Sequence, residues 1–443
     1  MKKVQAPASK SVSHRMMMGA ALANGESVVS RVLESRDLER TMAILRGAGA
    51  RIERIAAGEY AVTGVSGKPK GGDVLPLSCD VHESGTTCRL LTAILAAGSG
   101  SFRIHGAPRM HERPLGELTT ALERLGARFR FEDRTGFPPL VMETTGLNGG
   151  DIVIGMNESS QYLSGILLAA PLAHAPLEVM VGGSKVVSWP YVGLTLDALE
   201  LFGVPFSVEC RTASETGWEA ADWRSLNEVR PGLVRFLMQP AVYRPGRYAV
   251  EGDWSGASYL LASGAVGPEP VRVEGLNCRS LQGDRAMLDI LRSMGARVET
   301  EENAVTVFPS VLHGVTVDMN RCPDLVPTVA VLAAFAEGET TVTNVAHLRI
   351  KESDRIAAPA EELARAGVRT VQHADGLSIE GQGAALSTAL SALGTIRFSA
   401  HGDHRIAMSL ALLEMCGGRI ALDDPACVRK SFPDFWTVWE QIR

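Results

Sequence analysis

The chain has 443 residues, with 44 lysines and arginines against 50 aspartates and glutamates, and its formal net charge is −6. Hydrophobic residues make up 45% and charged residues 21%, which excludes collagen, coiled-coil and disordered chains and suggests two to three domains. The acidic balance argues against nucleic-acid binding, because such binding depends on clustered Lys and Arg. An anionic ligand would therefore need local positive charge.

The cysteines and the apolar segments indicate where the protein resides. Seven cysteines form no Cys-x-x-Cys pair, which favours reduced thiols over a disulfide framework or a structural zinc site. Basic residues precede the apolar run 16–23, as in a signal peptide, but the run is short and its pattern recurs later in the chain. No stretch reaches the roughly 18 uninterrupted apolar residues of a membrane span. We expect a cytoplasmic protein that does not bind membranes.

Two kinds of helical segment alternate along the chain, six of each. The first kind begins with small polar or charged residues and continues as an apolar run, which is typical of a buried helix. Its copies begin at Ser9, Glu83, Asn157, Gly252, Cys322 and His401. The second kind carries charge on one face, which is typical of a surface helix. Its copies begin at Leu38, Leu118, Leu194, Met287, Ala360 and Phe435.

Short segments with alternating or β-branched residues lie between these helices and predict strands. They span residues 27–32, 60–64, 103–105, 151–154, 271–273, 304–308 and 340–345. The pattern predicts an α/β (α+β) protein of six similar blocks. Two domains of three blocks would meet in the longest gap between polar helix starts, around residues 248–253.

The polar starts of the buried helices are candidate anion sites, because a helix N-terminus leaves N–H groups unpaired and carries partial positive charge. Ser, Thr, Asp and Asn are also the preferred N-caps, so a purely structural role remains open for each copy. Charged residues within or beside several starts favour a binding role. They are Lys10, Arg15, Arg89, Asp324, His404 and Arg405.

Three further charged segments precede surface helices, at 111–114, 349–355 and 429–433. A solvated surface would explain them, but Arg and Lys also suit phosphate and carboxylate ligands. Lys351 and Glu352 beside Arg355 could form an acid/base pair. The spacing His401-x-x-His404 is too short for an HExxH zinc helix, and Asp403 between them suits an N-cap. P-loop, Rossmann and Gly-x-Ser-x-Gly motifs are absent from the sequence.

Taken together, these segments resemble the 5-enolpyruvylshikimate-3-phosphate synthase (3-phosphoshikimate 1-carboxyvinyltransferase) family, from residue 7 to the C-terminus. The motifs occur in the family's order and at compatible spacing. They are Pro7-Ala8-Ser9-Lys10-Ser11, Ser84-Gly85-Thr86-Thr87-x-Arg89, Glu112-Arg113-Pro114, Ser159-Ser160-Gln161, Pro323-Asp324, Arg349-x-Lys351-Glu352-Ser353-Asp354-Arg355, Asp403-His404-Arg405 and Lys430-Ser431-Phe432-Pro433-Asp434.

The resemblance implies a fold of two domains, each with three βαβαββ units in pseudo-threefold symmetry, an inside-out α/β barrel. One domain would span residues 9–251, and the other 1–8 with 252–443, so that the chain crosses twice between them. The active site would lie in the interdomain cleft.

The implied reaction transfers the enolpyruvyl group of phosphoenolpyruvate to the 5-hydroxyl of shikimate 3-phosphate and releases phosphate, in the chorismate pathway of aromatic amino acid biosynthesis. It implies no metal and no organic cofactor, and we expect a monomer. By this resemblance Asp324 accepts a proton, while Lys10 and Glu352 handle the other proton transfers.

The resemblance also assigns the binding residues. Phosphoenolpyruvate would be bound by Lys10, Gly85, Arg113, Gln161, Arg355, Arg405 and Lys430. Shikimate 3-phosphate would be bound by Lys10, Ser11, Arg15, Ser159, Ser160, Gln161, Ser188, Tyr191, Asp324, His347 and Lys351.

Three positions depart from the family pattern. Glu83 and His347 stand where the family usually has Asn, and Ala8 replaces a Gly. We predict that the Glu83 carboxylate pairs with a cation such as Arg89 or turns away from the anion pocket. These changes bear on substrate affinity and inhibitor sensitivity more than on the type of reaction.

Two alternatives stay open at this point. The related UDP-N-acetylglucosamine enolpyruvyl transferases share fold and donor, but they typically carry a reactive Cys where this chain has Pro108. A non-catalytic anion-binding homologue would be consistent with Glu83 and His347, although every acid/base position holds a competent side chain.

Overall fold

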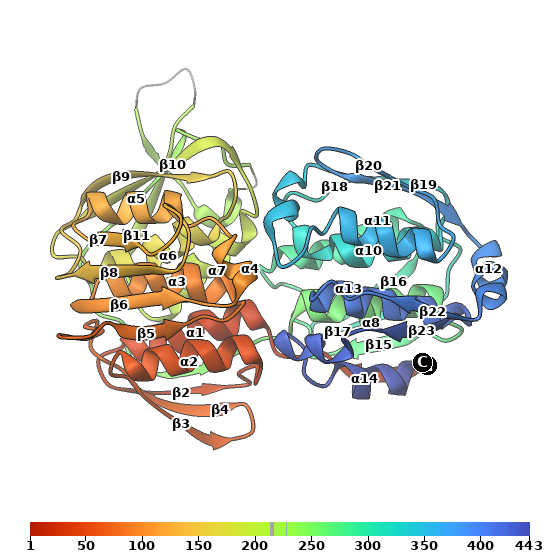
Figure 1. Cartoon of the computed structure of the whole chain (residues 1–443), viewed down its shortest axis with the longest axis horizontal. Helices are drawn as coiled ribbons and strands as arrows, with labels where there is room; N and C mark the ends of the chain where they lie inside the picture. The colour runs from red at the N-terminus through yellow and green to blue at the C-terminus, as the bar shows by residue number, and fades with distance from the viewer. Residues whose placement is uncertain (213–216, 227) are drawn as a thin grey trace. The chain divides into compact units, whose positions relative to one another are not determined.

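The computed structural model describes residues 1–212, 217–226 and 228–443 and has a mixed α/β fold of small sheets and helices (Figure 1). The chain forms two compact units. Unit 1 comprises Met1–Ser9 and Glu251–Arg443, and unit 2 comprises Lys10–Val250.

All twelve predicted helices form. Those of the first kind are α1 (Lys10–Leu22), α3 (Gly85–Ala96), α6 (Gln161–Ala169), α8 (Trp254–Val266), α10 (Val326–Ala334) and α13 (His404–Leu410). Those of the second kind are α2 (Arg36–Gly47), α5 (Gly116–Arg124), α7 (Pro190–Leu201), α9 (Met287–Ser293), α11 (Ala357–Arg365) and α14 (Phe435–Ile442). The short helices α4 (Pro108–His111) and α12 (Ala385–Leu393) were not anticipated.

Burial follows the predicted division, with one exception. All residues of α10 are buried, whereas α2 buries Leu38, Met42 and Leu45 along one stripe and exposes its charged face, as expected for an amphipathic surface helix. The expectation that α7 is a surface helix is wrong. Most of its residues are buried, because its apolar positions surround the helix and pack against α1 and α6.

Three sheets belong to unit 2. The first contains β14 (Arg247–Ala249), β2 (Glu26–Ser30), β4 (Glu59–Thr63) and β3 (Arg51–Ala56), in that order. The second contains β5 (Leu77–Asp80), β6 (Gly100–His105), β8 (Leu140–Thr144) and β7 (Arg128–Phe131). The third contains β12 (Glu219–Ala220), β11 (Phe206–Cys210), β13 (Val234–Met238), β10 (Leu177–Val186) and β9 (Gly150–Met156).

Three more sheets belong to unit 1. One contains β1 (Lys2–Gln5), β15 (Val271–Glu274), β17 (Ala304–Phe308) and β16 (Arg297–Thr300). Another contains β18 (Thr316–Asp318), β19 (Glu337–Thr343), β21 (Leu377–Gln382) and β20 (Thr370–Gln372). The last is the pair β22 (Thr395–Phe398) and β23 (Arg419–Leu422).

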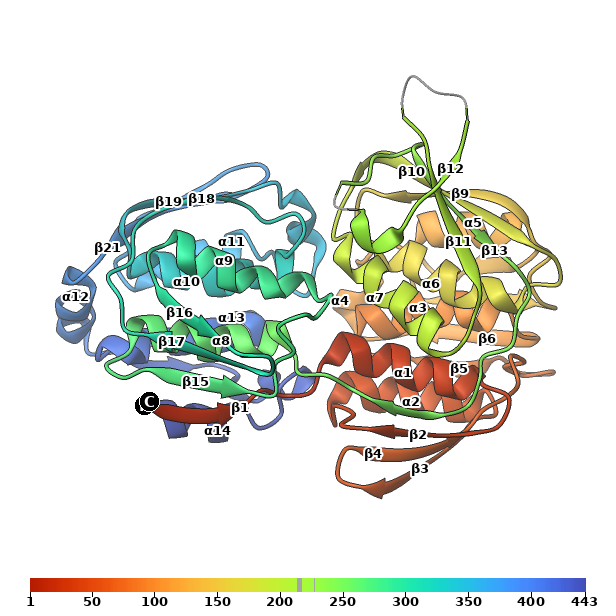
Figure 2. The same cartoon turned by 180° about the vertical axis from the view of Figure 1, so that it is seen from behind.

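Five of the six sheets in the described residues begin with a parallel pair followed by two antiparallel pairings, and the five-stranded sheet adds a third antiparallel pairing, β11 with β12. In two of them the parallel partner is distant in sequence. β14 completes the sheet of β2. β1 pairs with β15, and Figure 2 shows these two strands side by side. The repeated helix pattern in the sequence therefore corresponds to a repeated arrangement of strands.

The buried helices form the centre of each unit. In unit 1, α10 packs against α8 and α13, and their apolar residues belong to one hydrophobic core. In unit 2, α3 packs against α6 and contacts α1. Among the described residues, none of the helices has the length and apolar character required to cross a membrane.

Candidate active site

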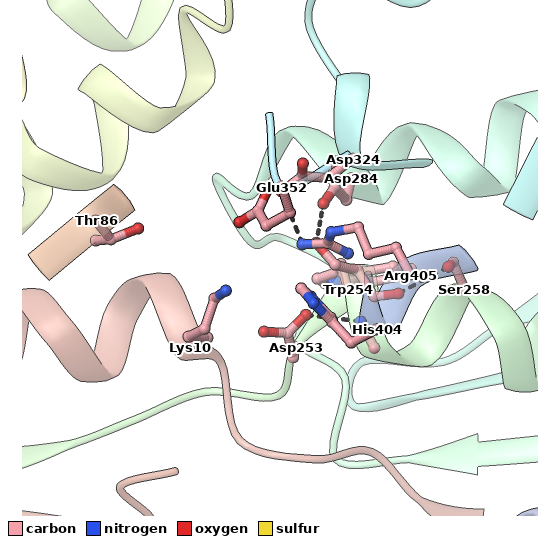
Figure 3. A network of polar contacts seen from close by, with 12 residues as sticks. Lys10, Thr86, Asp253, Trp254, Ser258, Asp284, Asp324, Glu352, His404 and Arg405 are labelled. Carbon is pink, nitrogen blue, oxygen red and sulfur yellow. Dashed lines mark hydrogen bonds and ion pairs between the residues drawn. The ribbon is translucent and has the colours of Figure 1, made fainter. Parts of the chain in front are cut away.

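Asp324 is the centre of a charged network in unit 1. It lies in the 3₁₀ turn Pro323–Leu325, directly before α10. Its Oδ1 accepts a hydrogen bond from Arg355 Nη1 at 2.9 Å, and its Oδ2 accepts one from Arg405 Nη2 at 2.7 Å. Figure 3 shows Asp324 beside Arg405. The carboxylate is therefore held in one orientation by two cations.

Arg355 is itself fixed by Asp403. The arginine side chain is only 2% exposed, and its Nε and Nη2 donate to the two oxygens of Asp403 at 2.7 and 3.1 Å. Asp403 also accepts from the backbone N–H of Arg405 at 2.9 Å as the N-cap of α13, which confirms its predicted capping role. The Asp403 carboxylate therefore contacts the side chain of Arg355 and the backbone of Arg405.

Glu352 and Lys430 extend this network. Glu352 Oε2 lies 3.1 Å from Arg355 Nη2, and its Oε1 lies 3.5 Å from Lys430 Nζ, at the end of a short 3₁₀ segment. Both side chains are largely buried, at 12% and 7% exposure. Unit 1 therefore brings together five of the predicted site residues: Asp324, Glu352, Arg355, Arg405 and Lys430.

The electrostatics of this group favour an ionised Asp324. Burial alone would raise its pKa, but the nearby Arg405, Arg355 and Lys351 outweigh burial and lower the pKa below its usual range. Ionised at neutral pH, Asp324 can accept a proton. His347, another predicted site residue, is buried in the 3₁₀ segment Ala346–Ile350, close in sequence to Lys351.

Asp284, which the sequence did not indicate, lies in the same part of unit 1. It is buried and accepts a hydrogen bond from Ser255 Oγ. Burial and the charge of Asp324 both raise the pKa of Asp284. The sequence did not mark it, because the charged residues that face it, Asp324 and Arg405, come from other segments.

In unit 2, Lys10 and Arg15 project from α1. Lys10 Nζ lies 3.3 Å from Asp37 Oδ2, a partner that the sequence did not indicate. Arg15 is buried and donates to Ser11 O at 2.9 Å, to Tyr191 O at 2.8 Å and to Thr195 Oγ1 at 2.9 Å. Burial lowers the pKa of Arg15 to about 10, so it stays charged at neutral pH.

A second cationic group lies over the first turn of α3. Ser84 caps this helix by accepting from Thr87 N–H. A Cβ atom on Gly85 would lie 2.6 Å from Arg113 Nη2 and 2.7 Å from Arg89 Nη1. Glycine is therefore required for both guanidinium groups to approach the helix N-terminus, where an anion is favoured.

The start of α6 joins this group. Gln161 Nε2 donates to Thr86 Oγ1 at 3.0 Å, and the Gln161 backbone N–H donates to Ser159 Oγ at 3.2 Å. Ser160 is buried and its carbonyl accepts from Ser164 N–H. Ser188 is buried, has a φ of 55°, and lies two residues before the start of α7, which carries Tyr191.

The capping interpretation holds for three of the six helix starts. Ser84, Asp253 and Asp403 accept hydrogen bonds from the first-turn N–H groups of α3, α8 and α13. Ser160 and Leu325, the residues directly before α6 and α10, make no such side-chain bond, although Ser159 accepts from the Gln161 N–H at the start of α6.

Glu83 is one of the three positions that depart from the family pattern. The backbone carbonyl of Glu83 accepts from Arg113 Nη1 at 3.4 Å, while the pairing of its carboxylate stays a prediction. Arg89 donates to Pro114 O and lies over the Tyr162 ring.

The seven cysteines are free thiols.

Comparisons with known proteins identify the family. Residues 1–219 and 228–439 match the model of EPSP synthase (3-phosphoshikimate 1-carboxyvinyltransferase). The 3-phosphoshikimate 1-carboxyvinyltransferase of Nitrosomonas europaea is 38% identical over 444 residues, covering 99% of this chain and 95% of the relative. The enzyme of that name from Methanosphaerula palustris is also 38% identical, over 97% of this chain and 94% of the relative.

A solved structure agrees. The EPSP synthase of Acinetobacter baumannii superposes with a TM-score of 0.76 at 27% identity, covering 99% of this chain and 95% of that one. The chain therefore belongs to the EPSP synthase family and is a 3-phosphoshikimate 1-carboxyvinyltransferase of the shikimate pathway, which leads to the aromatic amino acids.

Proposed function

We propose that the two groups of site residues act on the same pair of substrates, phosphoenolpyruvate and shikimate 3-phosphate. The observation that carries this proposal is the clamping of Asp324 between Arg355 and Arg405, at 2.9 and 2.7 Å. A mostly buried, ionised carboxylate beside fixed cations suits deprotonation of a hydroxyl next to an anionic substrate.

Asp324 accepts the proton of the 5-hydroxyl as the oxygen attacks carbon 2 of phosphoenolpyruvate. A proton is added to the methylene carbon, which gives a tetrahedral intermediate. Loss of phosphate and of a proton from the new methyl group then restores the enol ether. We assign these two transfers to Lys10 and Glu352, which can each hold or release a proton. Lys10 lies near Asp37, and Glu352 lies near Arg355 and Lys430.

We assign further residues to substrate binding, and the cations among them neutralise the charge of the substrates. The residues that we assign to phosphoenolpyruvate binding are Lys10, Gly85, Arg113, Gln161, Arg355, Arg405 and Lys430. Shikimate 3-phosphate is assigned to Lys10, Ser11, Arg15, Ser159, Ser160, Gln161, Ser188, Tyr191, Asp324, His347 and Lys351. Guanidinium and ammonium groups suit these phosphates and carboxylates. The contacts of Arg15 with Ser11 and Tyr191 support their common assignment.

We also propose that units 1 and 2 are domains of three blocks each, arranged as an inside-out barrel with pseudo-threefold symmetry. The pairing pattern shared by five sheets supports this arrangement. The enzyme is proposed to be a cytoplasmic monomer that uses no metal or organic cofactor, because side chains supply the acid, base and charge that the reaction needs.

One assay tests the acceptor. Phosphate release from phosphoenolpyruvate is measured with either shikimate 3-phosphate or UDP-N-acetylglucosamine, with and without a chelator. We expect turnover with the first acceptor alone, unaffected by the chelator. Turnover with the second alone would overturn the proposal, and ligand binding without turnover would indicate a non-catalytic homologue.

A further inference from the structure

The turn Ser399–Gly402 leads from β22 into α13 and ends directly before Asp403. His401 and Gly402 both have left-handed backbone conformations, with φ of 52° and 64°. Histidine adopts this conformation at a cost, so contacts elsewhere must hold the turn in place. The contacts come from two carboxylates on either side of it.

Glu362 of α11 holds one side. Its side chain is fully buried, and its Oε2 accepts from the Ser399 backbone N–H at 3.0 Å and lies 3.3 Å from Arg365 Nε. Its Oε1 lies 2.9 Å from His401 Nε2. Asp423 holds the other side, where it accepts from Ala400 N–H at 2.7 Å and from Ser399 Oγ at 2.6 Å.

What this turn positions is the acceptor for Arg355. Asp403 follows the turn, caps α13 and binds Arg355 through both oxygens. Arg355 and Arg405 in turn bind Asp324. A shift of the turn would therefore move Asp403 and change where both arginines point.

We propose that Glu362 and His401 are positioning residues for the transferase reaction, which hold Asp403 so that Arg355 and Arg405 meet phosphoenolpyruvate. This inference rests on the proposed function, because it takes these arginines as ligands of that substrate. Neither residue contacts Arg355 or Arg405 in the hydrogen bonds and ion pairs described for them; their effect passes through the turn.

The geometry makes this positioning sensitive to pH. His401 is partly exposed and faces Glu362 and Glu361 of α11 and Asp423 after β23, while Arg365 shares Glu362. A protonated imidazole would meet these carboxylates with a charge-assisted hydrogen bond, which is stronger than the neutral one. The charge of the imidazole therefore affects how firmly the turn is held.

Glu361, Glu362 and His401 could also share a cation, since their ligand atoms lie within 4.8 Å of one another. The direct contacts favour positioning instead. One oxygen of Glu362 already serves Ser399 and Arg365, and the other serves His401. A chelator distinguishes the two.

The test compares the whole enzyme with two variants and a matched control. His401→Asn removes the imidazole but retains a residue that tolerates left-handed backbone. Glu362→Gln keeps the shape and removes the charge. His313→Asn removes the histidine of an exposed His–Glu contact, His313 Nδ1 to Glu337 Oε2 at 3.7 Å. KM for both substrates, kcat and the thermal midpoint are measured at pH 6 and pH 8.5.

We expect His401→Asn to raise KM for phosphoenolpyruvate about tenfold at pH 6, the loss typical of one hydrogen bond between charged groups, and roughly threefold at pH 8.5. KM for shikimate 3-phosphate and the thermal midpoint should stay close to those of the parent. Glu362→Gln should raise the same KM without the pH dependence, and His313→Asn should change neither.

Several outcomes would overturn the proposal. They are an unchanged KM for phosphoenolpyruvate in His401→Asn, an equal rise at both pH values, an equal rise for both substrates, or a rise in parent KM on chelation, which would indicate a metal site. Failure of the parent enzyme to turn over contradicts the proposed function, whereas normal parent turnover with an unaltered variant contradicts only the positioning role.

Discussion

At the scale of single residues, Asp324 shows how neighbours decide chemistry. The nearby guanidinium groups outweigh burial and keep its pKa low. Asp324→Asn keeps the shape and loses the base, so we expect kcat to fall by about 10²–10⁴-fold, the range for general acid–base catalysis. Binding of shikimate 3-phosphate, followed by calorimetry, should change far less. Equal losses in turnover and binding would remove Asp324 from the catalytic residues.

The substitution Gly85→Ala tests the placement of the two arginines, Arg89 and Arg113, over the first turn of α3. A methyl group at this position would overlap Arg113 Nη2 and Arg89 Nη1, so Gly85→Ala should displace the guanidinium of Arg113. We expect KM for phosphoenolpyruvate to rise by about tenfold or more, the loss typical of one charged hydrogen bond, with a smaller change in kcat. Gly217 serves as the control, because a Cβ atom there meets nothing within 4 Å. An unchanged KM in Gly85→Ala would contradict the placement of Arg113.

The burial of His14 predicts how the free energy of unfolding depends on pH. It is fully buried, its Nδ1 lies 2.9 Å from Thr41 Oγ1, and burial lowers its pKa to about 3. Between pH 6.5 and 3 the unfolded chain therefore binds a proton that the folded chain does not, and stability falls as pH falls. The slope contributed by one such group approaches about 1.4 kcal/mol per pH unit.

Urea unfolding at pH 7 and pH 5 measures this contribution. We expect a smaller loss of the free energy of unfolding between these pH values in His14→Gln than in the parent. The exposed His313→Asn should behave like the parent. An identical pH dependence in parent and His14→Gln would show that His14 does not titrate as its burial implies.

At the scale of helices and strands, Asp403 has both a local role, as the N-cap of α13, and a long-range contact, with Arg355. It caps α13 and neutralises the buried Arg355. Asp403→Ala removes both functions and leaves a buried cation with one partner fewer, so we expect a loss of about 3–5 kcal/mol in stability. Asp403→Asn retains an acceptor for the cap, which is worth about 1 kcal/mol, and should lose less. Equal losses in the two variants, measured by chemical denaturation, would contradict this division.

Helices were easier to predict than their environment. The apolar runs of α8 and α10 and the one-sided charge of α2 follow directly from residue periodicity. The same reasoning misplaced α7, because two acidic residues suggested an exposed face on a helix whose other residues pack inward. The pairing of β1 with β15 and of β14 with β2 could not come from periodicity, since each joins segments more than 200 residues apart.

At the scale of the whole molecule, many of the residues quoted for the family resemblance contact one another within their own unit. Motif order predicted which residues matter, and the structure shows how Asp324, Arg355 and Arg405 contact one another. Asp37 and Asp284 were missed because the residues that they contact lie far from them in the sequence. Their partners, Lys10 and Ser255, come from other elements. Contacts of this kind depend on the tertiary fold.

The central claim is that one group from each unit serves the same substrate. The most direct test is the KM for phosphoenolpyruvate in two single variants, Arg113→Lys from unit 2 and Arg405→Lys from unit 1. Lysine keeps the charge and loses the forked geometry of the guanidinium. We predict that each variant raises this KM about tenfold or more, with little change in KM for shikimate 3-phosphate. A normal KM for phosphoenolpyruvate in either variant would contradict the account.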